Sequence, residues 1–147
     1  MSKKAPSPGR EQFKAFRPVS TRWRDNDVYG HVNNVVYYEY FDTAVNGYLI
    51  DTTGIDIREM SAIGVVVETG CQFFESVSFP ETLEIGLAVT HIGQSSIQYR
   101  LGVFRRDAQQ AAAEGRFVHV YVDAKTRTKV AIPAQIAEAA AQLVFLV

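Results

Sequence analysis

The sequence predicts an α+β fold in which a long antiparallel sheet curls around one central helix. Three observations support this prediction: one strand pattern comes first, one long helical pattern follows at about 34–50, and four consecutive strand patterns come next. Strands joined by short turns pair antiparallel. A helix of about 17 residues is about 25 Å long, and five strands spaced by about 4.8 Å cover a similar width. One helix can therefore cover one face of the sheet.

The first elements follow from local patterns. Residues 13–25 alternate between two faces, one of them polar, which predicts a strand with one solvated face. The next residues are rich in Asn, Asp and Gly and predict a loop. Asn33 or Asn34 is a natural N-cap for the helix at 34–50. The apolar stripe of this helix consists of Tyr38, Phe41, Val45, Tyr48 and Leu49.

The second half of the chain is dominated by strand patterns. A short helical turn is expected around 56–61, and strands are expected at 64–76, 82–92, 95–106, 112–123 and, briefly, 128–132. Pro133 opens an Ala-rich helix, and the apolar residues 143–147 are expected to pack against the sheet or a neighbour. Strands of this length must curl, and the uncovered face and edges need a partner. We therefore expect a homodimer and favour a homotetramer.

Composition places the chain among globular domains. It has 147 residues, of which 47% are hydrophobic and 21% charged, and we predict one domain at 13–147. Residues 1–12 are polar and rich in Pro, Lys and Ser, which predicts a flexible tail. The net charge of −1 argues against nucleic acid as a partner and against a polybasic membrane anchor. No apolar run is long enough for a membrane span, and the N-terminus does not resemble a signal peptide. The single cysteine, Cys71, is expected to be buried. Because one cysteine cannot form a disulfide within the chain, we expect a reducing compartment and predict a cytoplasmic protein.

The segment 21–38 concentrates the residues that could carry chemistry. The first turn of a helix exposes unpaired N–H groups with partial positive charge, which can polarise a carbonyl group. An ionised Asp just before that turn could act as a general base or a nucleophile. The spacing alone favours an N-cap followed by a polar loop over a reaction site, and both interpretations stay open at this point.

Spacing disfavours other chemistries. The stretch from Asp25 resembles the start of a calcium loop, but Tyr29 and Val36 stand where oxygen ligands are needed. Asp27 and His31 would form a dyad only on a helix, which Gly30 disfavours. The three histidines and the cysteine are too scattered for a zinc site, and no nucleophile elbow or phosphate loop occurs. No metal is predicted.

The same segment resembles the opening of hotdog-fold acyl-CoA thioesterases of the 4-hydroxybenzoyl-CoA thioesterase type. Its Gly-His-Val-Asn-Asn stretch is also similar to the plant acyl-carrier-protein thioesterases. Over residues 13–130 the resemblance extends to the order of elements. The matching residues are Arg22-x-x-Asp25-x-Asp27-x-x-Gly30-His31-Val32-Asn33-Asn34-x-x-Tyr37.

The resemblance implies a hotdog fold with active sites at a dimer interface. It implies that Asp27 is the catalytic carboxylate and that the backbone N–H at Asn34 polarises the thioester carbonyl, while Asp25 supports the loop. In related enzymes a carboxylate lies near the position of Glu68, although an ion-paired Glu at the rim is the alternative. The residues expected to bind substrate are Tyr29, Gly30, His31, Asn33, Tyr37, Glu68, Ser95 and Ser96.

The expected function is hydrolysis of an acyl thioester without a cofactor. The hairpin at 93–96 lacks the Lys and Arg that some relatives use for the coenzyme A phosphates. Contacts to phosphate would come from backbone N–H groups, serine hydroxyls or Arg100, Arg105 and Arg106, and the carrier could be coenzyme A or a carrier protein. Two alternatives are a hotdog enoyl-thioester hydratase, which needs Asp27 and His31 as an acid–base pair, and a non-catalytic acyl-thioester-binding domain.

Overall fold

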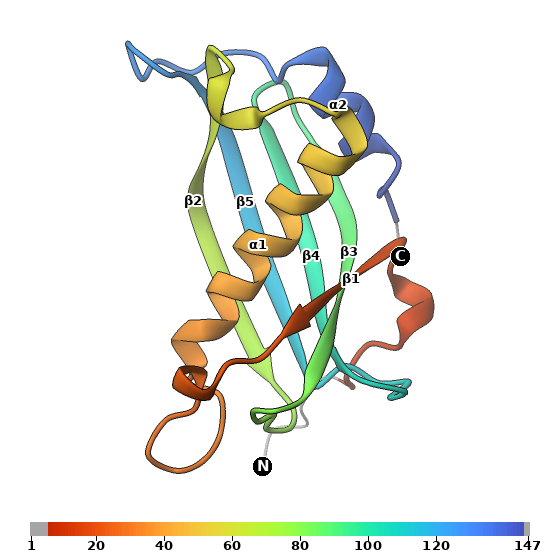
Figure 1. Ribbon diagram of the computed structural model, residues 1–147. Helices are drawn as coiled ribbons and strands as arrows, with labels where there is room; N and C mark the ends of the chain where they lie inside the picture. Colours follow the sequence, from red (N-terminus) through yellow and green to blue (C-terminus); the bar gives the residue numbers. More distant parts are fainter. Residues whose placement is uncertain (1–5, 146–147) are drawn as a thin grey trace, which may run out of the picture.

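A five-stranded antiparallel sheet curls around one long helix in the computed structural model, which describes residues 6–145 (Figure 1). The strand order is β1-β3-β4-β5-β2, so β1 and β2 form the two edges. The fold class predicted from the sequence is therefore confirmed. The elements are β1 (Ala15–Ser20), α1 (Asn34–Thr53), β2 (Ala62–Phe73), β3 (Thr82–Ile92), β4 (Ser96–Arg105), β5 (Ala113–Asp123) and α2 (Ala134–Ala141).

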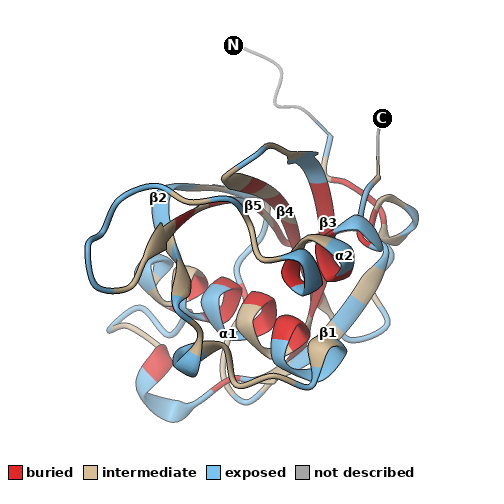
Figure 2. Ribbon diagram, turned by 90° about the horizontal axis from the view of Figure 1, so that it is seen from above, coloured by how far each residue is buried: buried red, intermediate tan, exposed pale blue. Residues whose placement is uncertain are grey.

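Helix α1 lies inside the curl of the sheet, with buried residues on its inner side (Figure 2). Asn33 is its N-cap, as predicted, and Gly54 ends it in a left-handed conformation with φ of 71°. Of the predicted apolar stripe, Tyr38 is only partly buried, because it lies at the margin of the contact with the sheet. The buried residues of α1 are Tyr37, Tyr40, Phe41, Ala44, Val45, Tyr48 and Leu49.

A second, smaller apolar cluster lies on the outer face of the sheet. It joins Phe13, Ala88, Phe104 and Ala111. Residues 6–12, which fall in the predicted tail, pack beside it, and the Arg10 guanidinium lies 4.8 Å from the centroid of the Phe104 ring. Such cation–π contacts depend on residues distant in sequence, so composition does not reveal them.

Two predicted strands differ most from the structure, and the strand predicted at 64–76 runs from Ala62 to Phe73. The first strand stops at Ser20, and a 3-10 turn, Trp23–Asp25, follows because the Asp25 carboxylate accepts the backbone N–H of Arg22. The predicted strand at 128–132 is absent, and only an isolated bridge joins Lys129 to Val122.

The C-terminal part packs as the sequence predicts. Pro133 precedes α2, and Leu143 is buried, with its carbonyl accepting the backbone N–H of Val89 in β3. Residues 146 and 147 of the predicted apolar segment lie outside the described residues. Within residues 6–145, no helix is both long and apolar enough to span a membrane.

Candidate active site

A tight loop carries Asp27 to the start of α1. An isolated bridge pairs Asn26 with Val32, and inside it the Asp27 N–H donates to the carbonyl of His31 at 2.8 Å. Gly30 turns the loop with φ of 87°, a conformation that disfavours other residues. The tip is exposed, with Tyr29 at 83% exposure. Asp27 is therefore held at the base of a closed loop while the tip faces solvent.

The Asp27 carboxylate is half-buried, and its two oxygens differ in their contacts. Its Oδ1 accepts the backbone N–H of Tyr29 at 2.8 Å. Among the described residues, no hydrogen bond or ion pair involves Oδ2. One oxygen thus fixes the side chain, and the other is available to a reactant.

Asp25 anchors this loop to the helix. Its carboxylate is 1% exposed and accepts hydrogen bonds from the Arg22 backbone and side chain and, at 2.8 Å, from the Tyr40 hydroxyl of α1. Burial by itself raises the pKa of Asp25, but these donors outweigh it and lower the pKa below its ordinary value. The backbone carbonyl of Asp25 also accepts the N–H of Asn33. These contacts give Asp25 the supporting position expected from the sequence.

The start of α1 presents an unpaired amide. The Asn33 side chain caps the helix by accepting the Val35 N–H at 3.1 Å, and its carbonyl accepts the Val36 N–H at 2.9 Å. The Asn34 N–H, between them, has no acceptor among the described residues. An amide at this position lies where the helix has partial positive charge, so it can bind the oxygen of a polarised carbonyl.

A pocket of about 260 Å³ adjoins this amide, between the start of α1 and the end of β2. Tyr37 is 2% exposed, and its ring stands perpendicular to that of Phe73 with the centroids 4.9 Å apart. Burial raises the pKa of Tyr37 to about 12, so its hydroxyl stays neutral at physiological pH. The lining residues are Val32, Asn34, Tyr37, Phe73, Phe74, Glu75 and Ser76.

One chain brings together most, but not all, of the predicted site residues. Tyr29, Gly30, His31, Asn33 and Tyr37 surround the loop and the helix start with Asp27 and Asn34. Glu68 is exposed on β2, where it pairs with Arg116 at 3.2 Å. Ser95 and Ser96 lie at the β3–β4 hairpin, at the opposite end of the sheet from the loop (Figure 1).

Contacts from distant segments also hold the loop, and these have no sequence signal. The Ser78 hydroxyl donates to the Gly30 carbonyl at 2.8 Å, and the Asn26 side chain accepts the Phe79 N–H at 3.0 Å. About 50 residues separate these partners, so only the fold brings them together. Tyr40, as the partner of Asp25, was likewise missed by the sequence analysis.

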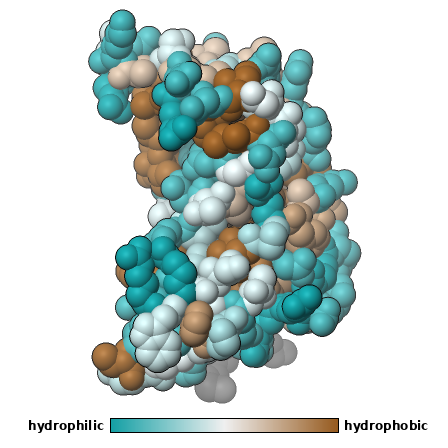
Figure 3. Space-filling model, viewed as in Figure 1, coloured by the Kyte–Doolittle hydropathy of each residue, from teal (hydrophilic) through white to brown (hydrophobic). Residues whose placement is uncertain are grey.

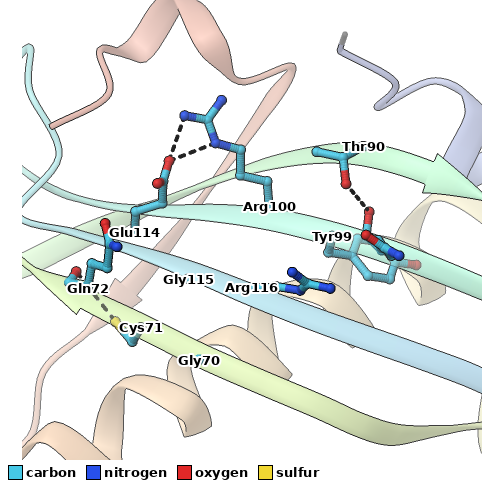
Figure 4. A pocket seen from close by; sticks show the side chains of 10 residues that line it. Gly70, Cys71, Gln72, Thr90, Tyr99, Arg100, Glu114, Gly115 and Arg116 are labelled. Atoms are coloured by element: carbon cyan, nitrogen blue, oxygen red, sulfur yellow. Dashed lines mark hydrogen bonds and ion pairs between the residues drawn. The ribbon is translucent and has the colours of Figure 1, made fainter. Parts of the chain in front are cut away.

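The arginines considered for phosphate binding are mostly committed to ion pairs. Arg105 pairs with Glu81 at 2.6 Å. Arg100 pairs with Glu114 at 2.6 Å, in a pocket of about 410 Å³ that the sheet separates from α1 (Figure 4). Arg106 is exposed and has no ion pair among the described residues.

Cys71 lines the same outer pocket and is half-buried rather than fully buried as predicted, because β2 is an edge strand. Burial raises the pKa of its thiol to about 12, which keeps the sulfur protonated. Within residues 6–145, no three His, Cys, Asp or Glu side chains gather as metal ligands would.

The fold and the loop before α1 define a class of protein. A family model of the thioesterase-like superfamily matches residues 21–140. The chain therefore belongs to the thioesterase-like superfamily, and its sheet and central helix are those of hotdog thioesterase structures.

Several known proteins resemble the chain. The PA5185 protein of Pseudomonas aeruginosa strain PAO1 is 51% identical, with a TM-score of 0.93 over 95% of this chain and 98% of that one. Slr0204, a 1,4-dihydroxy-2-naphthoyl-CoA thioesterase from Synechocystis, is 15% identical and shares the fold, with a TM-score of 0.79 over 87% and 96% of the two chains. The uncharacterised protein YsmA of Bacillus subtilis (strain 168) is 28% identical over 85 residues, which span 58% of this chain and 57% of YsmA.

Proposed function

We propose that this protein is an acyl-CoA thioesterase in which Asp27 and the Asn34 backbone N–H carry out the reaction. The observation that carries the proposal is a helix-start amide beside a loop that presents a carboxylate oxygen, neither of which has a partner within residues 6–145. The pocket of about 260 Å³ next to Asn34 is lined by aromatic side chains and suits the acyl group. Membership of the thioesterase-like superfamily supports an acyl thioester as the substrate.

The Asn34 N–H donates a hydrogen bond to the thioester oxygen and stabilises the negative charge that develops there. In one route, an Asp27 carboxylate oxygen attacks the carbonyl carbon, the C–S bond breaks, and the thiolate departs. The product is a mixed anhydride between Asp27 and the acyl group, which water then hydrolyses. In the other route, Asp27 takes a proton from the attacking water, and the thiolate leaves and is protonated. Both routes yield the carboxylic acid and the thiol, and neither needs a cofactor.

We propose that the working unit contains two copies of the chain joined through β2. This strand is an edge of the sheet, and Val66 and Val67 are 45% and 58% exposed on it. Figure 3 shows a hollow on the side of the molecule where β2 lies, with hydrophobic atoms beside it. Exposed apolar edges favour pairing with another strand. Sedimentation equilibrium measures this association directly.

A two-fold related copy would also account for the predicted residues that lie apart. The two-fold reverses the direction of β2, so the β3–β4 hairpin end of one copy reaches the level of the Asp27 loop of the other. Ser95 and Ser96 of the second copy could then approach the carrier of the substrate. Glu68 lies near the middle of β2 and would face the junction of the two copies.

The test is thiol release from a panel of acyl-CoA substrates by the Asp27→Asn variant. Asparagine keeps the carbonyl oxygen that accepts the Tyr29 N–H, so the loop is expected to stay folded. We expect turnover to fall by about 10²–10⁴-fold. Asp51→Asn, an exposed aspartate paired with Arg17, is the control and should retain activity.

Near-normal turnover in the folded Asp27→Asn variant would contradict the assignment. Binding of acyl-CoA without any thiol release, unaffected by the substitution, would instead indicate a non-catalytic acyl-thioester-binding domain. Hydration of an enoyl thioester without thiol release would indicate the hydratase.

A further inference from the structure

The Tyr40 hydroxyl joins the body of α1 to the loop that carries Asp27. Tyr40 is 3% exposed, and its hydroxyl donates a hydrogen bond of 2.8 Å to the buried Oδ2 of Asp25. The 3-10 turn that contains Asp25 lies beside the start of α1 (Figure 1). Tyr40 lies six residues after Asn34 in this helix. The bond therefore ties the second turn of α1 to a loop that ends where the helix begins.

The backbone of Asp25 is linked to both reacting groups of the proposed site. Asp25 precedes Asp27 by two residues, and its carbonyl accepts the Asn33 N–H at 2.9 Å, directly before Asn34. With the Tyr40 bond, these links close a ring that runs from α1 through Asp25 and back to the first residue of α1. The ring fixes where the Asp27 loop stands relative to the Asn34 amide.

Tyr40 differs from the other donors to the Asp25 carboxylate. Arg22 donates through its backbone N–H and its side chain, but it belongs to the same turn as Asp25 and moves with it. Arg22 reaches α1 through an exposed ion pair with Glu39 at 2.6 Å, and exposed ion pairs contribute little. Within residues 6–145, Tyr40 is the only residue of α1 that bonds the Asp25 carboxylate directly.

The environment of the Tyr40 hydroxyl suits holding rather than reacting. Tyr40 does not line the pocket beside Asn34, although its ring lies 6.2 Å, between centroids, from that of Tyr37, which does. Burial and then the charge and hydrogen bond of Asp25 raise the pKa of Tyr40, so its hydroxyl keeps its proton. The hydroxyl is thus a permanent donor to Asp25.

We infer that Tyr40 is a positioning residue, which acts through Asp25 to hold the Asp27 carboxylate at the correct distance from the Asn34 N–H. This inference rests on the proposed thioesterase function and adds a residue to it. A displacement of about 1 Å in a reacting group can slow a reaction by about 10²-fold. Loss of the hydroxyl should therefore slow the chemical step and leave the binding of the acyl group unchanged.

The test is Tyr40→Phe, which removes only the hydroxyl and keeps the ring against Tyr37. We expect kcat for thiol release to fall by about 10- to 100-fold with KM unchanged. Tyr48→Phe is the matched control, because Tyr48 is another buried tyrosine of α1 whose hydroxyl donates to the Ala139 carbonyl at 2.6 Å, away from the loop. It loses the same kind of bond and should keep its kcat, even where thermal melting shows a similar loss of stability.

Two further variants separate positioning from a general loss of stability. In the Asp27→Asn background, Tyr40→Phe should reduce kcat by no more than about twofold, because the spacing matters only while Asp27 reacts. Arg22→Gln removes the other side-chain donor to Asp25 at an exposed position, where folding is not at risk, and should lower kcat in the same direction. An unchanged kcat in folded Tyr40→Phe, an equal fall in Tyr48→Phe, or full additivity with Asp27→Asn would overturn the inference.

Hydrogen exchange measured by NMR tests the same tie without turnover. The N–H groups of Asp27 and Asn33 are both hydrogen-bonded within the loop. Tyr40→Phe should speed their exchange by about tenfold, the effect of one hydrogen bond to a charged group, and Tyr48→Phe should not. Absence of thiol release from the unmodified protein would count against the proposed function. Unchanged exchange in Tyr40→Phe would overturn the positioning role whether or not the protein hydrolyses thioesters.

Discussion

The Asn34 amide can be removed without removing the helix, because Asn34 is the first residue of α1. Proline is tolerated at this position, where the missing N–H has no intrahelical acceptor. The residue before a proline must be extended, and Asn33 already has φ of −61° and ψ of 139°. Asn34→Pro should therefore delete one hydrogen-bond donor and leave the cap and the helix in place.

The expected effect is a fall in kcat of about 10²–10³-fold, the usual loss for one donor to a developing oxyanion. Asn34→Ala keeps the amide and changes the side chain, so it is the matched control and should stay close to the unmodified protein. The assay is thiol release under substrate saturation, with circular dichroism and thermal melting to verify the helix. If Asn34→Pro is folded and retains full kcat, the amide does not polarise the carbonyl and the reasoning is refuted.

Two further predictions concern stability and assembly. The pKa of His119 is about 4 in the folded protein against an ordinary value of 6.5, so between these values the unfolded chain binds a proton that the folded chain does not. Lowering the pH from 7 to 5 should therefore reduce the free energy of unfolding of the unmodified protein by about 2 kcal/mol more than that of the His119→Phe variant, as measured by urea denaturation. The same pH dependence in both proteins would contradict this. Val67→Lys, which places a charge on the exposed edge of β2, should shift the protein toward monomer in sedimentation equilibrium, whereas Lys125→Ala, on an exposed turn, should not.

Local signals in the sequence were sufficient for most of the fold. The start of α1 was predictable because Asn33 is a cap whose hydrogen bond reaches only two residues ahead. The strand at 82–92 has the predicted bounds because its breaks are local. The predicted end of the first strand was wrong. The alternation of polar and apolar residues continues through Arg22 and Trp23, but the side chain of Asp25 closes a turn there. Alternation describes side-chain faces and does not show where such a side chain captures the backbone.

In the candidate site, too, residues close together in the sequence were predictable and contacts between distant segments were not. Asp27, Gly30 and Asn34 lie within one short segment, so spacing alone can relate them to a helix start. The contacts of Ser78 with the loop and of Tyr37 with Phe73 cross between segments, and periodicity carries no information about them. The pocket of about 180 Å³ that His119 lines is predictable from neither, because its lining residues range from 46 to 136 in the sequence.

Two carboxylates in one loop have different environments, and in the proposed reaction this difference separates the carboxylate that supports the loop from the one that reacts. Asp25 is buried, and its carboxylate is engaged by Arg22 and Tyr40, which lowers its pKa and ties the loop to α1. Asp27, two residues later, is half-buried and gives only one oxygen to the loop, at the Tyr29 N–H. A carboxylate engaged by several donors is a poor nucleophile or base because its negative charge is already stabilised. In the proposed reaction, the loop thus uses the first carboxylate for position and leaves the second one available for chemistry.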